Sequence, residues 1–239
     1  MIPLKDDIEH RSFPYVNTAI IALNVGLFLL ELFMGDKLRG IFLQNAFVPA
    51  DYTIHLSLRG IRIARLFYAP FLSMFLHGGF IHIAGNMLFL WVFGDNVEDR
   101  LGHLRYLVFY LLCGLAATFI QFIFAPTSAS PVIGASGAIA GVLGAYLVLF
   151  PKARILTLVP IVIIFWAVRL PAFLVLPFWF IVQLFNGWTA IVADFSGGVA
   201  WFAHIGGFLA GAAYLWFNRK RFRPIEEHPE HIVVYGDND

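Results

Sequence analysis

The sequence predicts an all-α, polytopic membrane protein with six transmembrane helices and a long interfacial first loop. Composition is the first reason: of 239 residues, 60% are hydrophobic and 13% are charged, and the mean hydropathy is +0.79. Soluble domains carry roughly 25% charged residues. The charges also cluster, so several windows long enough to cross a bilayer carry almost none of them.

Six apolar windows account for the helices, since a transmembrane helix needs about 20 mainly apolar residues. They are 15–34, 71–93, 106–124, 132–150, 170–185 and 199–217. Between the first two, the segment 35–68 interleaves apolar residues with basic ones, which predicts that it lies in the membrane interface. The apolar stretch 155–168 is too short for a span and is interpreted as a buried or interfacial segment.

The chain is expected to form one membrane domain at 15–217. A cytoplasmic N-terminal segment at 1–14 precedes it, and a cytoplasmic polar tail at 218–239 follows. Lys and Arg residues are more numerous in the segments predicted on the inner side than in those predicted on the outer side, which puts both termini in the cytoplasm. The first loop is the exception, and we expect its arginines to lie at a lipid surface. The expected location is the plasma (inner) membrane of a prokaryote.

Net charge limits the partners. A value of +1 argues against nucleic acid, and the apolar windows make the lipid bilayer the expected surroundings. The oligomeric state stays open.

The segment Gly134-Ala135-Ser136-Gly137 opens the fourth window and is the first candidate site. Its glycines leave the Ser136 hydroxyl accessible. The start of a helix also offers unpaired N–H groups and a dipole that favours negative charge, as a tetrahedral oxyanion requires. The alternative interpretation is a helix–helix interface, because Gly137 and Gly141 form a small-xxx-small pair.

His204 in the sixth window is the second candidate. Gly207 and Gly211 share its helical face and would let this helix pack closely against the fourth. A serine and a histidine within hydrogen-bond reach form a nucleophile and a general base. No acid is placed to orient the histidine, so a dyad is favoured over a triad. The alternative is a packed, hydrogen-bonded histidine.

His77, His82 and Asn86 form the third candidate, in the first half of the second window. His82 and Asn86 share a helical face, and both can donate hydrogen bonds to an oxyanion. The rival interpretation is a metal site made of the three histidines, including His204. Because no H-E-x-x-H motif or suitably spaced carboxylate completes it, neither a metal nor a cofactor is predicted.

Together, these clusters resemble the rhomboid family of intramembrane serine proteases. The resemblance rests on His77-x4-His82-x3-Asn86, Gly134-Ala135-Ser136-Gly137, Ala203-His204-x2-Gly207-x3-Gly211 and Gly94-Asp95-Asn96-Val97-Glu98-Asp99, in this order. It implies a six-helix bundle with a water-filled cavity, a fifth span that acts as a gate, and transmembrane protein substrates.

The resemblance also implies a role for each residue. Ser136 would attack the scissile carbonyl, and His204 would accept its proton. His82, Asn86 and the Ser136 N–H would hold the oxyanion, while His77 would organise hydrogen bonds nearby.

Two positions depart from the family pattern. Several relatives carry a Trp-Arg pair in the first loop, where this chain has Arg65-Leu66-Phe67-Tyr68. Some also carry a tyrosine, stacked on the catalytic histidine, where Ala140 stands here. That support is therefore absent or comes from another aromatic residue.

Other functions remain as alternatives. A rhomboid-like protein that binds membrane clients without cleaving them usually lacks the serine or the histidine, and both are present. A transporter or channel would carry more charges within its spans. An aspartyl intramembrane protease needs two intramembrane aspartates, whereas Asp95 and Asp194 are predicted in loops.

Overall fold

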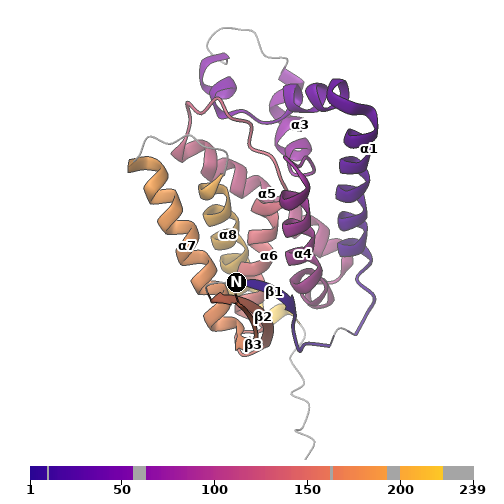
Figure 1. The fold of residues 1–239 in the computed structure, drawn as a ribbon, viewed down its shortest axis with the longest axis vertical. Coiled ribbons are helices and arrows are strands. Elements are labelled where there is room, and N and C mark those ends of the chain that lie inside the picture. Colours follow the sequence, from indigo (N-terminus) through magenta and orange to yellow (C-terminus); the bar gives the residue numbers. More distant parts are fainter. Residues whose placement is uncertain (10, 56–62, 162–163, 193–199, 223–239) are drawn as a thin grey trace, which may run out of the picture.

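The computed structural model describes residues 1–9, 11–55, 63–161, 164–192 and 200–222, and in these residues it is mostly helical, as predicted (Figure 1). The α-helices of the described residues form a bundle, with α1 and α7 on opposite sides of it and α6 and α8 between them. Their bounds are α1 Tyr15–Asn45, α3 Ile63–Ser73, α4 Phe80–Leu101, α5 His103–Phe124, α6 Ser136–Leu149, α7 Ala172–Val192 and α8 Trp201–Asn218.

The protein is an integral membrane protein. Four segments of the described residues are long and apolar enough to cross a membrane by length and composition: Tyr15–Asp36, Phe80–Leu101, His103–Phe124 and Ala172–Ala190. The two other predicted spans correspond to α6 and α8. With 14 residues, α6 extends only about 21 Å. All its residues from Gly137 to Tyr146 are buried, which is expected of a helix that is apolar all round and packs at the centre of a bundle.

The second span differs from its predicted bounds of 71–93. Its helix, α4, begins at Phe80 and continues to Leu101 through the acidic cluster formed by Asp95, Glu98 and Asp99. Glu98 in that cluster is almost fully buried because it accepts the N–H groups of Val16 and Asn17, at 2.9 and 2.6 Å. The carboxylate thus caps the first turn of α1, where the helix dipole favours negative charge.

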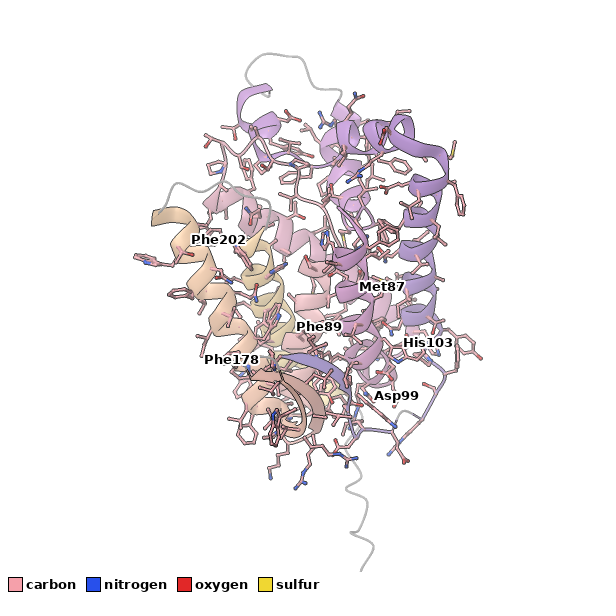
Figure 2. The ribbon with its side chains drawn as sticks, in the orientation of Figure 1. Met87, Phe89, Asp99, His103, Phe178 and Phe202 are labelled. Carbon is pink, nitrogen blue, oxygen red and sulfur yellow. The ribbon has the colours of Figure 1, made fainter. Side chains whose placement is uncertain are left out.

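The N-terminal segment is attached to this end of the bundle. Figure 2 shows Asp99 and His103 near the chain that leads into α1, and Asp99 accepts hydrogen bonds from the backbone and hydroxyl of Ser12. Asp6 accepts from Asn96 at 2.8 Å and from Tyr146. Burial raises the pKa of Asp6 to about 6. This segment therefore connects α4 with the end of α6.

The stretch at 155–168 forms strands, which the sequence did not predict. β2 (Arg154–Ile161) and β3 (Ile164–Pro171) pair as an antiparallel hairpin, and β1 (Ile2–Lys5) pairs with β2. The hairpin is rich in β-branched and aromatic residues, which favour strands. After it, α7 extends to Val192, beyond the end of the fifth window at residue 185, so the first half of the predicted loop between the fifth and sixth windows is helical. The remainder of that loop and most of the predicted tail lie outside the described residues.

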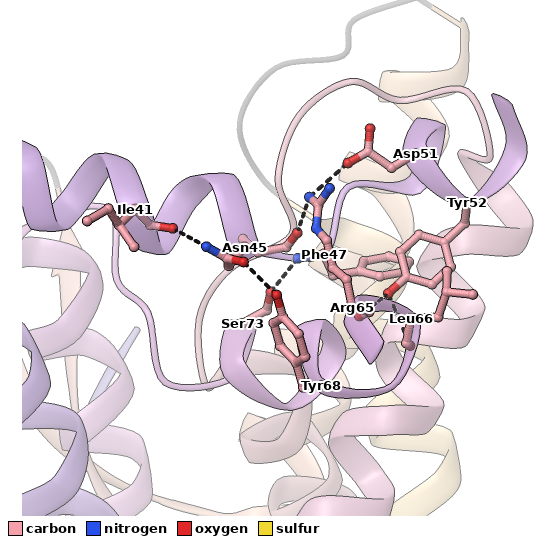
Figure 3. A network of polar contacts seen from close by, with 10 residues as sticks. Ile41, Asn45, Phe47, Asp51, Tyr52, Arg65, Leu66, Tyr68 and Ser73 are labelled. Carbon is pink, nitrogen blue, oxygen red and sulfur yellow. Dashed lines mark hydrogen bonds and ion pairs between the residues drawn. The ribbon is translucent and has the colours of Figure 1, made fainter. Parts of the chain in front are cut away.

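Polar contacts connect the described parts of the first loop, as Figure 3 shows. Arg65 forms an ion pair with Asp51 at 2.8 Å and donates to the carbonyl of Ala46 at 3.0 Å. Arg39 donates to the carbonyl of Gly78 at 3.1 Å. The expectation that the loop arginines lie at a lipid surface is therefore wrong for Arg65, which is partly buried and paired within the protein.

Contacts with the first loop and with the end of α3 delay the start of the fourth helix, which was expected from residue 132. The N–H of Val132 donates to Phe47, and that of Gly134 donates to Ser73, both at 2.9 Å. These bonds hold Val132 and Gly134 outside the helix, so α6 begins at Ser136.

The close packing of α6 and α8 depends on glycines. A Cβ atom on Gly207 would lie 1.9 Å from the carbonyl oxygen of Gly137, and one on Gly211 would lie 1.9 Å from that of Gly141. No side chain fits in either place. This confirms the prediction that the glycines of the sixth span let it pack directly against the fourth.

Replacing Gly207 by alanine is expected to force the two backbones apart. Overpacking a well-packed core costs about 1–3 kcal/mol, and here the obstacle is a backbone carbonyl that cannot rotate away. We expect the unfolding temperature in detergent to fall by several degrees, as measured by circular dichroism. The matched control is Gly26→Ala on α1, where an added Cβ meets no heavy atom within 4 Å in the described residues. Equal unfolding temperatures for the two variants would contradict the packing argument.

Candidate active site

Ser136 is the first residue of α6 and is only partly buried. The first N–H groups of a helix have no partner within it, and Ala135 at the N-cap has no side chain that could bond to them. The serine hydroxyl therefore lies beside unpaired backbone donors, where negative charge is stabilised.

His204 lies in the first turn of α8 and faces Ser136. Its Nε2 atom is 2.8 Å from the Ser136 Oγ atom. The glycine contacts of α8 with α6 begin one turn further on, at Gly207. Ser136 and His204 are 68 residues apart in the chain, and this helix packing brings them within hydrogen-bond distance.

The second ring nitrogen of His204 has a partner that the sequence analysis missed. Its Nδ1 atom lies 2.8 Å from the Oε1 atom of Gln183 on α7. A polar residue inside an apolar span is the signal that could have identified Gln183, because such residues tend to be functional. The side chain is 5% exposed.

Aromatic rings also surround the histidine. The ring of Trp179 on α7 lies 5.9 Å from that of His204, and the ring of Trp201 lies 6.1 Å from it, edge-on. The support that Ala140 cannot give therefore comes from α7 and α8.

His82 and Asn86 on α4 face the same point. The N–H of Gly78 donates to His82 Nδ1 at 3.2 Å, so the neutral ring carries its proton on Nε2. A Cβ on Gly134 would lie 2.7 Å from this Nε2 atom and 3.6 Å from the Asn86 Nδ2 atom. Gly134 leaves this space open, and its φ of 117° is one that residues with a side chain rarely adopt.

Asn86 has an unsatisfied donor. Its Nδ2 atom is buried and has no hydrogen-bond partner among the described residues. A buried donor without a partner costs about 1–3 kcal/mol. An acceptor bound beside Gly134 would remove that cost.

An open cavity joins these groups. It lies between α4 and α7, and its lining includes His82, Asn86, Ser136, His204 and Trp179 together with apolar residues. Polar groups gathered in a mainly apolar cavity are typical of a binding site.

His77 is buried beside the cavity, with its ring 5.1 Å from that of His82. Across the part of the chain that the structure describes, no group of three or more His, Cys, Asp or Glu residues is arranged to hold a metal ion. His82 and His204 instead use ring nitrogens in the hydrogen bonds described above.

Fold and site together define a polytopic membrane protein with an internal cavity, in which a serine and a histidine are hydrogen-bonded beside two further donors. The chain belongs to the rhomboid family, because the family model for the rhomboid domain matches residues 64–221. This match includes α3 to α8 and every candidate site residue.

Individual relatives agree with this assignment. The chain is 32% identical over 152 residues to presenilin-associated rhomboid-like protein A, mitochondrial, of Danio rerio. It is also 32% identical over 153 residues to rhomboid protein 1, mitochondrial, of Saccharomyces cerevisiae. Each match covers 62% of this chain, but only 37% and 41% of the two relatives. Rhomboid protease GluP of Bacillus subtilis is 46% identical over 72 residues, 30% of this chain and 14% of the relative.

The arrangement of His82 can be tested by solid-state ¹⁵N spectroscopy of histidine-labelled protein. We expect a neutral His82 ring with its proton on Nε2, identified by the signal lost in His82→Asn. Gly134→Ala should shift this signal, because the new Cβ would overlap the ring. Gly79→Ala is the matched control, since its extended backbone accepts a side chain and no heavy atom of the described residues lies within 4 Å of the new Cβ. A His82 signal that is identical in the unsubstituted protein, in Gly134→Ala and in Gly79→Ala would refute this geometry.

Proposed function

We propose that the chain is an intramembrane serine endopeptidase that cleaves transmembrane proteins within or near the bilayer. Ser136 is the nucleophile and His204 is the general base. The observation that carries the proposal is the 2.8 Å contact between His204 Nε2 and Ser136 Oγ at the start of a buried helix. Such a pair is the arrangement that activates a serine. Membership of a family that includes a named protease supports the same activity.

The first half of the reaction forms an acyl-enzyme. His204 Nε2 removes the hydroxyl proton as Ser136 Oγ attacks the scissile carbonyl. The oxyanion that forms is held by the Ser136 N–H, by His82 Nε2–H and by the amide of Asn86, whose donor is otherwise unpaired. The imidazolium of His204 then donates its proton to the leaving amine as the peptide bond breaks.

The second half releases the new carboxyl terminus. A water molecule attacks the acyl group while His204 removes one of its protons, and the same three donors hold the second oxyanion. Collapse of this intermediate breaks the ester and returns the proton to Ser136 Oγ. The polar side of the cavity supplies a place for this water, which the surrounding bilayer cannot hold.

The shape and lining of the cavity suit a substrate segment that is extended and partly apolar. The cavity lies between α4 and α7, and apolar residues such as Phe89 and Leu143 line it away from the dyad. A peptide bond can approach Ser136 only where the substrate is not helical, because helical N–H and C=O groups are already paired and shielded. Substrates with the helix-breaking residues glycine or proline near the cleaved bond are therefore favoured.

We also propose that both termini lie in the cytoplasm and that the membrane is the plasma membrane of a prokaryote. The excess of Lys and Arg on the predicted inner segments and the Bacillus subtilis relative support this placement. The relatives with mitochondrial names favour a mitochondrial membrane instead. Subcellular fractionation of the cells that make the protein separates these locations.

Orientation can be tested with cysteine labelling, since Cys113 is buried and is the sole native cysteine. In intact bacterial cells that express the protein, an impermeant maleimide should label Asp36→Cys on the outer side. Asn218→Cys should react only after the cells are permeabilised. Labelling of Asn218→Cys in intact cells would overturn the proposed orientation.

The dyad predicts a specific chemical reactivity. Detergent-solubilised protein treated with a fluorophosphonate should form an adduct at Ser136, located by mass spectrometry. Ser136→Ala should abolish it, and His204→Ala should slow it by about 10²-fold or more, because general-base assistance contributes about 10²–10⁴. Cleavage of a model single-span substrate should fall in parallel.

Ser130→Ala, a change in the loop before α6, is the control and should react as the unsubstituted protein does. An unlabelled Ser136 in protein with a normal unfolding temperature would contradict the dyad. It would favour the alternative of a rhomboid-like protein that binds membrane clients without cleaving them.

A further inference from the structure

Gln183 is a buried polar side chain in a mainly apolar helix. It is 5% exposed, and its neighbours along α7 are mainly apolar and aromatic. A buried amide needs hydrogen-bond partners, or it destabilises the helix packing. It has two: its Nε2 atom donates to the carbonyl of Trp179 at 3.3 Å, and its Oε1 atom lies 2.8 Å from His204 Nδ1.

These two bonds fix the direction of the amide. The carbonyl of Trp179 can only accept a hydrogen bond, so the amide nitrogen must face it, and the amide oxygen must face the histidine. Because that oxygen can only accept, His204 Nδ1 must carry a proton. The neutral ring then presents the lone pair of Nε2 to the hydroxyl of Ser136.

We propose that Gln183 is a positioning residue for the dyad: its side-chain oxygen holds His204 in the tautomer and orientation in which Nε2 accepts the Ser136 proton. This inference rests on the proposed function. Gln183 does not touch the reacting bond and acts only through the histidine.

A consequence concerns the position of α7. Trp179 and Gln183 are one helical turn apart and lie on the same face, and both contact the His204 ring. Trp179 also lines the cavity. The helix that borders the cavity therefore also carries the group that orients the base. A displacement of α7 away from α8 would break the bond to Nδ1 and leave the ring free to rotate away from Ser136.

An amide gives orientation without charge, and this separates two effects that an acid would combine. A carboxylate at the same place would orient the ring and also stabilise the imidazolium form. Gln183→Glu should therefore keep the orientation but change the pH dependence, whereas Gln183→Leu should remove the orientation alone.

The test compares Gln183→Leu and Gln183→Glu with Asn186→Leu, a matched control that makes a similar change one turn further along α7. We expect Gln183→Leu to slow fluorophosphonate labelling of Ser136 by about 10-fold to 10²-fold. Its kcat for a single-span substrate should fall by a similar factor with KM unchanged. Gln183→Glu should keep most of the rate, and the acid limb of its pH profile should move to higher pH. Asn186→Leu should match the unsubstituted protein.

A spectroscopic measurement gives a second readout that does not need activity. Solid-state ¹⁵N spectra should show His204 protonated on Nδ1 in the unsubstituted protein, and a mixture of tautomers in Gln183→Leu. If Gln183→Leu folds normally and has an unchanged labelling rate and an unchanged His204 spectrum, the proposal is overturned. A change in KM alone would overturn it as well.

Failure of the proposed function gives a different pattern. If Ser136 of the unsubstituted protein is not labelled, the protease activity fails. The His204 spectrum still tests the positioning role. A tautomer that depends on Gln183 would support that role, and one that does not would overturn it.

Discussion

Direct backbone contact between α6 and α8 is the constraint on which the other features depend. The carbonyls of Gly137 and Gly141 occupy the places that side chains at Gly207 and Gly211 would take. Contact this close leaves little freedom in the distance between the two helices. The 2.8 Å separation of Ser136 and His204 follows from it, because each residue lies within one turn of a glycine contact. Association of membrane helices relies on such packing, since lipid is as apolar as the side chains and provides no hydrophobic driving force.

The central position of α6 creates a second requirement, which the first loop meets. A helix that begins inside a membrane protein exposes N–H groups and an extended chain, and neither can be left unpaired in the hydrocarbon region. Phe47 and Ser73 accept the N–H groups of Val132 and Gly134, just before the serine. Phe47 lies in the first loop and Ser73 at the end of α3, and the ion pair of Arg65 and Asp51 connects α3 with that loop. The loop therefore supports the chain that presents Ser136.

Local patterns in the sequence predicted the bundle and much of the candidate site, whereas features made by distant residues were missed. The glycines after His204 repeat at helical spacing, and the serine lies between glycines, so both could be recognised within a few residues. The acidic cluster after Gly94 was expected to end the second span, because the caps that Glu98 provides to Val16 and Asn17 lie more than 80 residues away. The hairpin at 154–171 was missed because a short apolar run does not distinguish a strand from a buried helix. Gln183 belongs to no motif, and only the fold brings it to His204.

The partner of His204 Nδ1 is an amide rather than a carboxylate, and this choice suits the physical setting. A carboxylate on α7 would have to be buried in a mainly apolar region, where an ionised side chain is costly unless it is fully paired. The amide of Gln183 costs much less to bury, because its two hydrogen bonds, to Trp179 and to His204, satisfy it. It also fixes the tautomer of the ring. It offers no negative charge to stabilise the imidazolium that forms during the reaction. The imidazolium form of His204 would thus be less stabilised than in a triad. The ring would still be oriented, without a buried charge beside it.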